Sequence, residues 1–154
     1  MWRLGFFFHE IAFGLLSVFI PLYVITPAIG GTLFDLGIMT AGALFLSIPA
    51  AFFWGYISDK TRRYKLYVLL SFISAAVLLY LFTFATNVIT FTILYAIMAV
   101  LHVAHEAPKN ILIAEHYSHE DWGKSYALYE GFTEIGWLIG LLLGFFNVLK
   151  NRKA

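Results

Sequence analysis

Five long apolar runs, separated by short polar turns, make up most of this 154-residue sequence. A bilayer core about 30 Å thick requires roughly 20 apolar residues in a helix, because hydrocarbon offers the backbone no hydrogen-bond partner outside the helix. Every run is long enough to meet that requirement. The sequence therefore predicts an all-α, polytopic membrane bundle of about five transmembrane helices, at residues 4–25, 36–57, 66–86, 88–114 and 126–149.

The composition agrees with a membrane protein. Hydrophobic residues make up 61% of the chain, charged residues only 12%, and the mean hydropathy is +0.82, which lies outside the usual balance of a water-soluble domain. The runs leave almost nothing for a soluble domain, so residues 1–154 are expected to form a single transmembrane domain. A net charge of +1 and the lack of Cys give no indication of nucleic acid as a partner and exclude thiolate metal sites.

Basic residues indicate the orientation, because Lys and Arg concentrate in cytoplasmic loops. If the spans alternate, six basic residues fall on one side: Arg3, Lys60, Arg62, Arg63, Lys65 and Lys124. The loops near 26–35 and 87 hold none, so we expect a cytoplasmic amino terminus in the plasma membrane. Five spans would place Lys150, Arg152 and Lys153 on the opposite side. Either the fifth helix does not fully cross, or a complete protein continues beyond this end, and we favour the second interpretation.

The densest charge lies between the second and third runs, in "GYISDKTRRYKLY" at residues 55–67. This stretch resembles the pattern G-x-L-a-D-[RK]-x-G-R-[RK] of major facilitator superfamily transporters. The match rests on six residues: Gly55, Ile57, Ser58, Asp59, Lys60 and Arg63. Two positions depart from the pattern, since Arg62 replaces the second glycine and Tyr64 replaces the last basic residue. "IPLYV" at 20–24 and "WGYISD" at 54–59 also look like this family.

The resemblance implies a secondary transporter of a small solute, with no enzyme activity and no cofactor. A complete member has twelve helices in two six-helix halves and binds substrate near the midplane between them. The five runs resemble most of the first half, so the expected partner is the missing carboxyl-terminal half or a second copy. The resemblance further implies that five residues of the loop form a lock that holds the cytoplasmic side shut: Gly55, Ser58, Asp59, Lys60 and Arg63.

Ionisable residues inside the runs predict a pathway, because a charge in hydrocarbon costs about 2.5–3.5 kcal/mol on insertion scales and usually faces a cavity or partner. "HVAHEAPK" at residues 102–109 places two His, a Glu and a Lys at i, i+3, i+4 and i+7 on one helix face. Carboxyl and imidazole groups can exchange protons. We therefore expect solute or protons to pass along six residues: Glu10, His102, His105, Glu106, Lys109 and Glu134. The alternative is that several of them are solvated near helix ends.

Glycines recur at spacing four in the last run, at Gly136, Gly140 and Gly144. Small residues at this spacing permit close helix contact, so we interpret them as packing residues.

Two other functions are open to the sequence. The first is a His/Glu metal-dependent membrane enzyme, because "HVAHE" and "HYSHE" both spell H-x-x-H-E, a pattern that can ligate metal ions. The copies start 14 residues apart, about 21 Å along a continuous helix, which is too far to share ions, so we expect no metal site. The chain can also be a self-assembling or regulatory membrane subunit without transport of its own.

Overall fold

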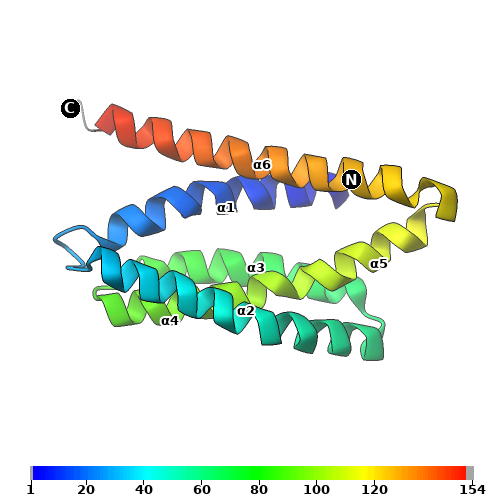
Figure 1. The fold of residues 1–154 in the computed structure, drawn as a ribbon, viewed down its shortest axis with the longest axis horizontal. Helices are drawn as coiled ribbons and strands as arrows, with labels where there is room; N and C mark the ends of the chain where they lie inside the picture. Colours follow the sequence, from blue (N-terminus) through cyan, green and yellow to red (C-terminus); the bar gives the residue numbers. More distant parts are fainter. Residues whose placement is uncertain (1, 152–154) are drawn as a thin grey trace. The chain divides into compact units, whose positions relative to one another are not determined.

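The computed structural model describes residues 2–151, and the regular structure within them is helical. Within these residues, six α-helices and two short 3₁₀ helices follow one another, and Figure 1 labels the α-helices. In chain order they are α1 (Trp2–Val24), α2 (Leu33–Thr61), α3 (Tyr64–Phe82), α4 (Val88–His102), η1 (Val103–His105), α5 (Glu106–His116), η2 (His119–Asp121) and α6 (Trp122–Asn151).

Five helical segments are long and apolar enough to cross a membrane. They are Leu4–Val24, Leu33–Thr61, Tyr64–Phe82, Val88–His116 and His119–Val148, so α4, η1 and α5 together form the fourth. Large apolar side chains such as Leu33, Phe45 and Phe52 are exposed on these segments, as expected where lipid covers a helix instead of protein. The predicted all-α fold with five spans is confirmed.

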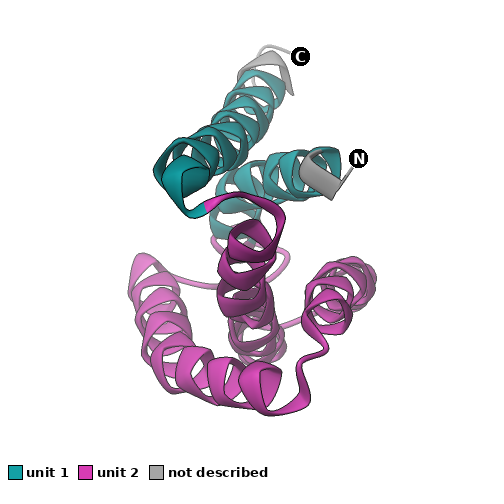
Figure 2. Ribbon diagram, turned by 90° about the vertical axis from the view of Figure 1, so that its right-hand side faces the viewer, with its two compact units in different colours: residues 1–23, 119–154 teal, residues 24–118 magenta. Residues whose placement is uncertain are grey.

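The chain divides into two compact units (Figure 2). The first unit comprises residues 1–23 and 119–154, and its long helices are α1 and α6. The second unit comprises residues 24–118 and contains α2, α3, α4, η1 and α5.

In the first unit, glycines of α6 let the backbones of α1 and α6 come into contact. A Cβ atom added at Gly140 would overlap the carbonyl group of Ile11, and one added at Gly136 would lie 2.6 Å from the Phe7 carbonyl oxygen. A Cβ atom at Gly144 would lie 3.0 Å from the Val18 side chain, a less severe contact. Only a residue without Cβ fits against backbone at the two tighter positions.

In the second unit, side-chain caps fix where two helices begin. The Thr32 hydroxyl accepts a hydrogen bond from the Asp35 N–H at 3.2 Å, and the Asp35 carboxylate accepts one from the Thr32 N–H at 2.8 Å. This reciprocal capping box satisfies two amides that would otherwise lack partners, so α2 begins at Leu33, earlier than expected. Asn87 caps α4 in a similar way, accepting from the Thr90 N–H at 2.8 Å.

The turn between α2 and α3 places a non-glycine residue in the left-handed region. Arg62 has φ 53° and ψ 23°, and its N–H donates to the Ser58 carbonyl at 2.8 Å. A side chain in this conformation costs roughly 1–2 kcal/mol relative to glycine. In the superfamily pattern this position is the second glycine, and glycine is the residue that adopts a left-handed conformation without strain.

The fourth span is not one regular helix, because it contains a proline. Pro108 has no N–H, and its ring would clash with the Ala104 carbonyl in a continuous helix. The chain passes through one 3₁₀ turn, in which the Glu106 N–H bonds to the Val103 carbonyl. Helix α5 then starts at Glu106, which puts Pro108 in its first turn, where proline is tolerated.

Polar contacts tie the helices of the second unit together, although most of their surface is apolar. The Trp54 indole N–H of α2 donates to the Val100 carbonyl of α4 at 2.8 Å. The Tyr67 hydroxyl of α3 lies 2.9 Å from the Thr61 hydroxyl of α2. Helices α2 and α3 also pack on the 3₁₀ turn of the fourth span, where the candidate site lies.

Candidate functional site

A carboxylate that bridges two basic side chains lies where the fourth span changes from 3₁₀ helix to α-helix. One Glu106 oxygen lies 3.1 Å from Nε2 of His105, and the other lies 2.9 Å from Nζ of Lys109. The His105 and Lys109 side chains are only 1% and 5% exposed, whereas the Glu106 side chain is 46% exposed. The cluster therefore has one accessible acid and two enclosed basic groups.

Burial makes this ion pair asymmetric. An ammonium group removed from water is strongly destabilised unless a counter-charge lies next to it. Lys109 has that counter-charge in Glu106, while the half-exposed carboxylate can be solvated at the surface of the unit. Charge on Glu106 is therefore more important to Lys109 than charge on Lys109 is to Glu106.

Ser71 of α3 extends the cluster, although its sequence position does not single it out. Its side chain is completely buried, and its hydroxyl oxygen lies 3.1 Å from Nδ1 of His105 and 3.1 Å from the His102 carbonyl oxygen. The Phe72 ring meets the His105 ring edge-to-face at 6.2 Å. A serine within an apolar run commonly bonds to its own helix, so no local pattern indicates this contact between helices.

The six predicted pathway residues are divided between the two units. His102, His105, Glu106 and Lys109 lie in the second unit, and the rings of the two histidines are 4.9 Å apart. Glu10 lies half-buried on α1, and Glu134 is exposed on α6, both in the first unit. The structure thus brings together the four residues of the fourth span.

The five lock residues lie at the end of α2 and in the turn that follows it. Ser58 is buried and its hydroxyl donates to the Gly55 carbonyl at 2.8 Å. Asp59, Lys60 and Arg63 are exposed, and among residues 4–148 they form no ion pair with one another. Their charged groups face outward from the second unit.

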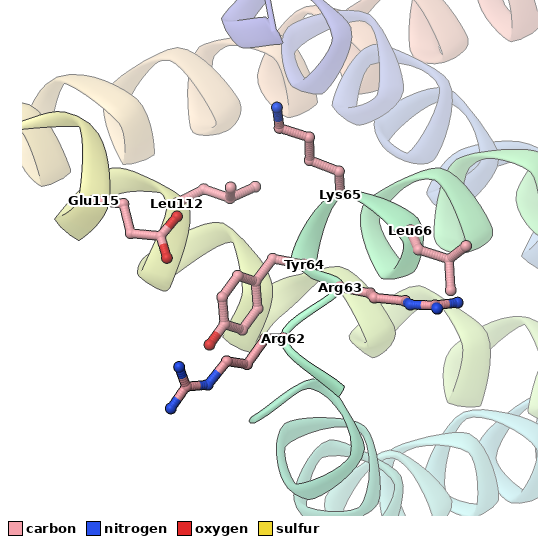
Figure 3. Close-up of a pocket in the computed structure, with 7 residues that line it drawn as sticks. All are labelled: Arg62, Arg63, Tyr64, Lys65, Leu66, Leu112 and Glu115. Atoms are coloured by element: carbon pink, nitrogen blue, oxygen red, sulfur yellow. The ribbon is translucent and has the colours of Figure 1, made fainter. Parts of the chain in front are cut away.

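The same turn forms part of an open pocket of about 400 Å³. Seven residues line it (Figure 3): Arg62, Arg63, Tyr64, Lys65, Leu66, Leu112 and Glu115. In the close-up, the basic side chains point in different directions instead of toward one point. The pocket carries much of the loop's positive charge, but its basic groups do not converge on a common ligand position.

The second H-x-x-H-E copy, at residues 116–120, starts on α5 but does not stay on that helix. Helix α5 ends at His116, whose ring nitrogen donates to the Leu112 carbonyl at 3.2 Å. His119 belongs to the other unit and stacks on the Trp122 ring at 4.0 Å. Only the first residue of the second copy therefore belongs to the helix that carries Glu106.

These features define a multi-pass membrane protein with buried ionisable groups in one of its spans. The family model of the Major Facilitator Superfamily matches residues 4–148. The chain belongs to this superfamily, whose members are transporters and not enzymes, and its five candidate spans form part of the superfamily fold. Comparison with curated proteins and with solved structures gives no match.

Proposed function

We propose that this chain provides part of a proton-coupled secondary transporter of a small solute, in which Glu106 takes up the coupled proton. The observation that carries the proposal is the Glu106 carboxylate, which is accessible at one end and bridges two enclosed basic groups. Ionised groups in a membrane span are usually found along ion and solute pathways. Superfamily membership supports the transporter class.

Protonation of Glu106 changes the free energy of the cluster. A neutral carboxyl group no longer compensates the charge of Lys109, and an uncompensated buried charge is worth about 3–5 kcal/mol. An energy difference of this size is enough to shift a two-state equilibrium from one conformation to the other. Proton binding at Glu106 can thereby be coupled to the movement that exposes a solute to the opposite side of the membrane.

The other predicted pathway residues complete this proposal. Glu10 and Glu134, on α1 and α6, contribute to the same route together with His102. The lock residues act at the cytoplasmic end, where Asp59 and Arg63 are exposed and can pair with a helix from the rest of a longer protein or from a second copy. The orientation, with a cytoplasmic amino terminus in the plasma membrane, rests on the basic loop, while Arg152 and Lys153 lie outside the described residues.

Proton movement in proteoliposomes tests the proposal even when the solute is unidentified. The protein is purified from its native membrane together with any partner chain that accompanies it, reconstituted with a pH-sensitive dye inside the vesicles, and exposed to a panel of small solutes one at a time. At least one solute should produce a pH change in wild-type vesicles and none in Glu106→Gln vesicles. Glu115→Gln, the same change at an exposed position of α5, should behave as wild type. A solute-driven pH change that survives in Glu106→Gln would contradict the proton role.

A further inference from the structure

The hydrogen bonds around His105 allow its ring to hold either one proton or two. Nε2 faces an oxygen of Glu106 at 3.1 Å, and Nδ1 faces the Ser71 hydroxyl at 3.1 Å. An ionised carboxylate can only accept hydrogen bonds, so Nε2 carries a hydrogen that it donates to Glu106. The ring position left for a second hydrogen is therefore Nδ1, whose partner is Ser71.

Ser71 has one hydroxyl hydrogen and two acceptors within reach. When the ring is neutral, the hydroxyl donates to Nδ1 of His105. When Nδ1 is protonated, it donates to the hydroxyl oxygen, and the hydroxyl hydrogen turns to the His102 carbonyl oxygen at 3.1 Å. In both states each of these buried groups has a partner, as buried polar groups require.

The 3₁₀ turn places the second acceptor in this position. In a regular helix the Glu106 N–H would donate to the His102 carbonyl, four residues earlier. Here that N–H donates to the Val103 carbonyl instead, and the Ser71 hydroxyl reaches the His102 carbonyl from the neighbouring helix. The 3₁₀ turn thus directs the Glu106 N–H away from the His102 carbonyl, which is the second target that a switching hydroxyl needs.

Within the second unit, the ionisable groups around the ring come from the fourth span itself. His102 contacts the His105 ring at 4.9 Å, Glu106 binds Nε2, and Lys109 binds the other Glu106 oxygen. Helix α3 contributes Ser71 and Phe72 to the ring, and neither ionises in water near neutral pH. Helix α2 also packs on η1. Its Tyr56, Asp59 and Lys60 side chains are exposed, and its Asp35 binds Thr32.

We propose that Ser71 is a positioning residue whose hydroxyl rotates between Nδ1 of His105 and the His102 carbonyl, so that the buried imidazole can gain and lose a proton. In the charged state the added proton stays on Nδ1, and the covalent O–H bond of Ser71 is not broken. This inference rests on the proton role proposed for the cluster and names the residue that lets His105 share in it.

The ¹⁵N NMR spectrum of His-labelled protein in lipid nanodiscs tests this role, because it distinguishes singly from doubly protonated imidazole. His105→Asn identifies the His105 signals among the five histidines of the chain. In the parent protein, neutral His105 should be the tautomer with hydrogen on Nε2. In Ser71→Ala, the ratio of doubly to singly protonated ring at a fixed pH should fall about tenfold, since an unpaired charged donor costs more than an unpaired neutral acceptor.

Three further variants separate switching from folding. Ser71→Thr keeps a hydroxyl and should restore the parent ratio, while Ser71→Cys keeps a similar shape with a weak hydrogen-bonding group and should behave as Ser71→Ala. Ser74→Ala removes a hydroxyl of the same helix that donates to the Ser71 carbonyl, and it should leave the ratio unchanged. An unchanged ratio in both Ser71→Ala and Ser71→Cys would overturn the inference. The spectrum needs no solute, so a failure of the transport proposal would be seen separately, in the vesicle assay.

Discussion

The two units of this chain hold their helices together by different means. In the first unit, α1 and α6 meet through glycines, and backbone lies against backbone at Gly136 and Gly140. In the second unit, Glu106 binds the buried side chains of His105 and Lys109, and the buried Ser71 of α3 binds His105. A glycine contact depends on volume and does not respond to a proton. A contact made by ionisable groups depends on charge, so proton binding can change the contact in the second unit and leaves the glycine contact as it is.

The largest expected effect is on the charge-dependent contact. Glu106→Gln leaves the buried ammonium of Lys109 without a counter-charge. It should lower the free energy of unfolding in detergent by about 3 kcal/mol, the lower end of the usual range because Glu106 is half exposed. Lys109→Met removes the enclosed charge itself and should cost distinctly less.

A double variant sharpens this prediction. If the two residues form one electrostatic unit, Glu106→Gln combined with Lys109→Met should be more stable than Glu106→Gln alone. Equal losses from the two single variants, adding up in the double variant, would show that the contact does not depend on charge as we describe.

A smaller loss in the free energy of unfolding is expected when a side chain is enlarged in the first unit. Gly140→Ala places a methyl group against the Ile11 carbonyl, and overpacking of this kind typically costs about 1–3 kcal/mol. Gly55→Ala is the matched control, because a Cβ atom there would lie 3.8 Å from the Ala107 side chain, an ordinary contact. That control should be neutral or slightly stabilising, since alanine favours helix more than glycine does. Denaturant unfolding in detergent measures both variants, and an equal loss in the free energy of unfolding for Gly140→Ala and Gly55→Ala would show that the distance to the neighbouring atom does not determine the cost.

The smallest effect should have the opposite sign. Arg62→Gly relieves the left-handed strain at φ 53° but adds freedom to the unfolded chain, which leaves a net gain of about 0.5 kcal/mol. The adjacent Arg63→Gly serves as control, because Arg63 has φ −101° and no such strain to relieve. The midpoint of thermal unfolding should therefore rise in Arg62→Gly and fall in Arg63→Gly. A lower midpoint in Arg62→Gly would contradict the strain argument.

The length of the apolar runs was sufficient to predict the five spans, because a helix that crosses the bilayer must satisfy its backbone hydrogen bonds within itself and must be long enough to span the hydrocarbon. The contact between Glu106 and Lys109 could likewise be predicted, because residues three apart on a helix are adjacent on its surface. Thr32 and Asp35 carry the spacing of a capping box, so the early start of α2 was also open to prediction.

The remaining features depend on tertiary structure. Pro108 indicated a disturbance in the fourth span, but a proline in a membrane helix can be accommodated by a kink or by a 3₁₀ turn. Ser71 was not predictable, because its partners lie 31 and 34 residues further along the chain. A contact over that distance follows from how the helices pack, and apolar periodicity does not specify it.

Coupling of a proton to solute movement at Glu106 can be measured directly by comparing two modes of transport in the same proteoliposomes. The first is accumulation driven by a pH gradient, and the second is exchange of labelled for unlabelled solute without a gradient. Glu106→Gln should retain the exchange, which also shows that it is folded, and lose the accumulation. Gradient-driven accumulation in Glu106→Gln equal to that of wild type would contradict the coupling role.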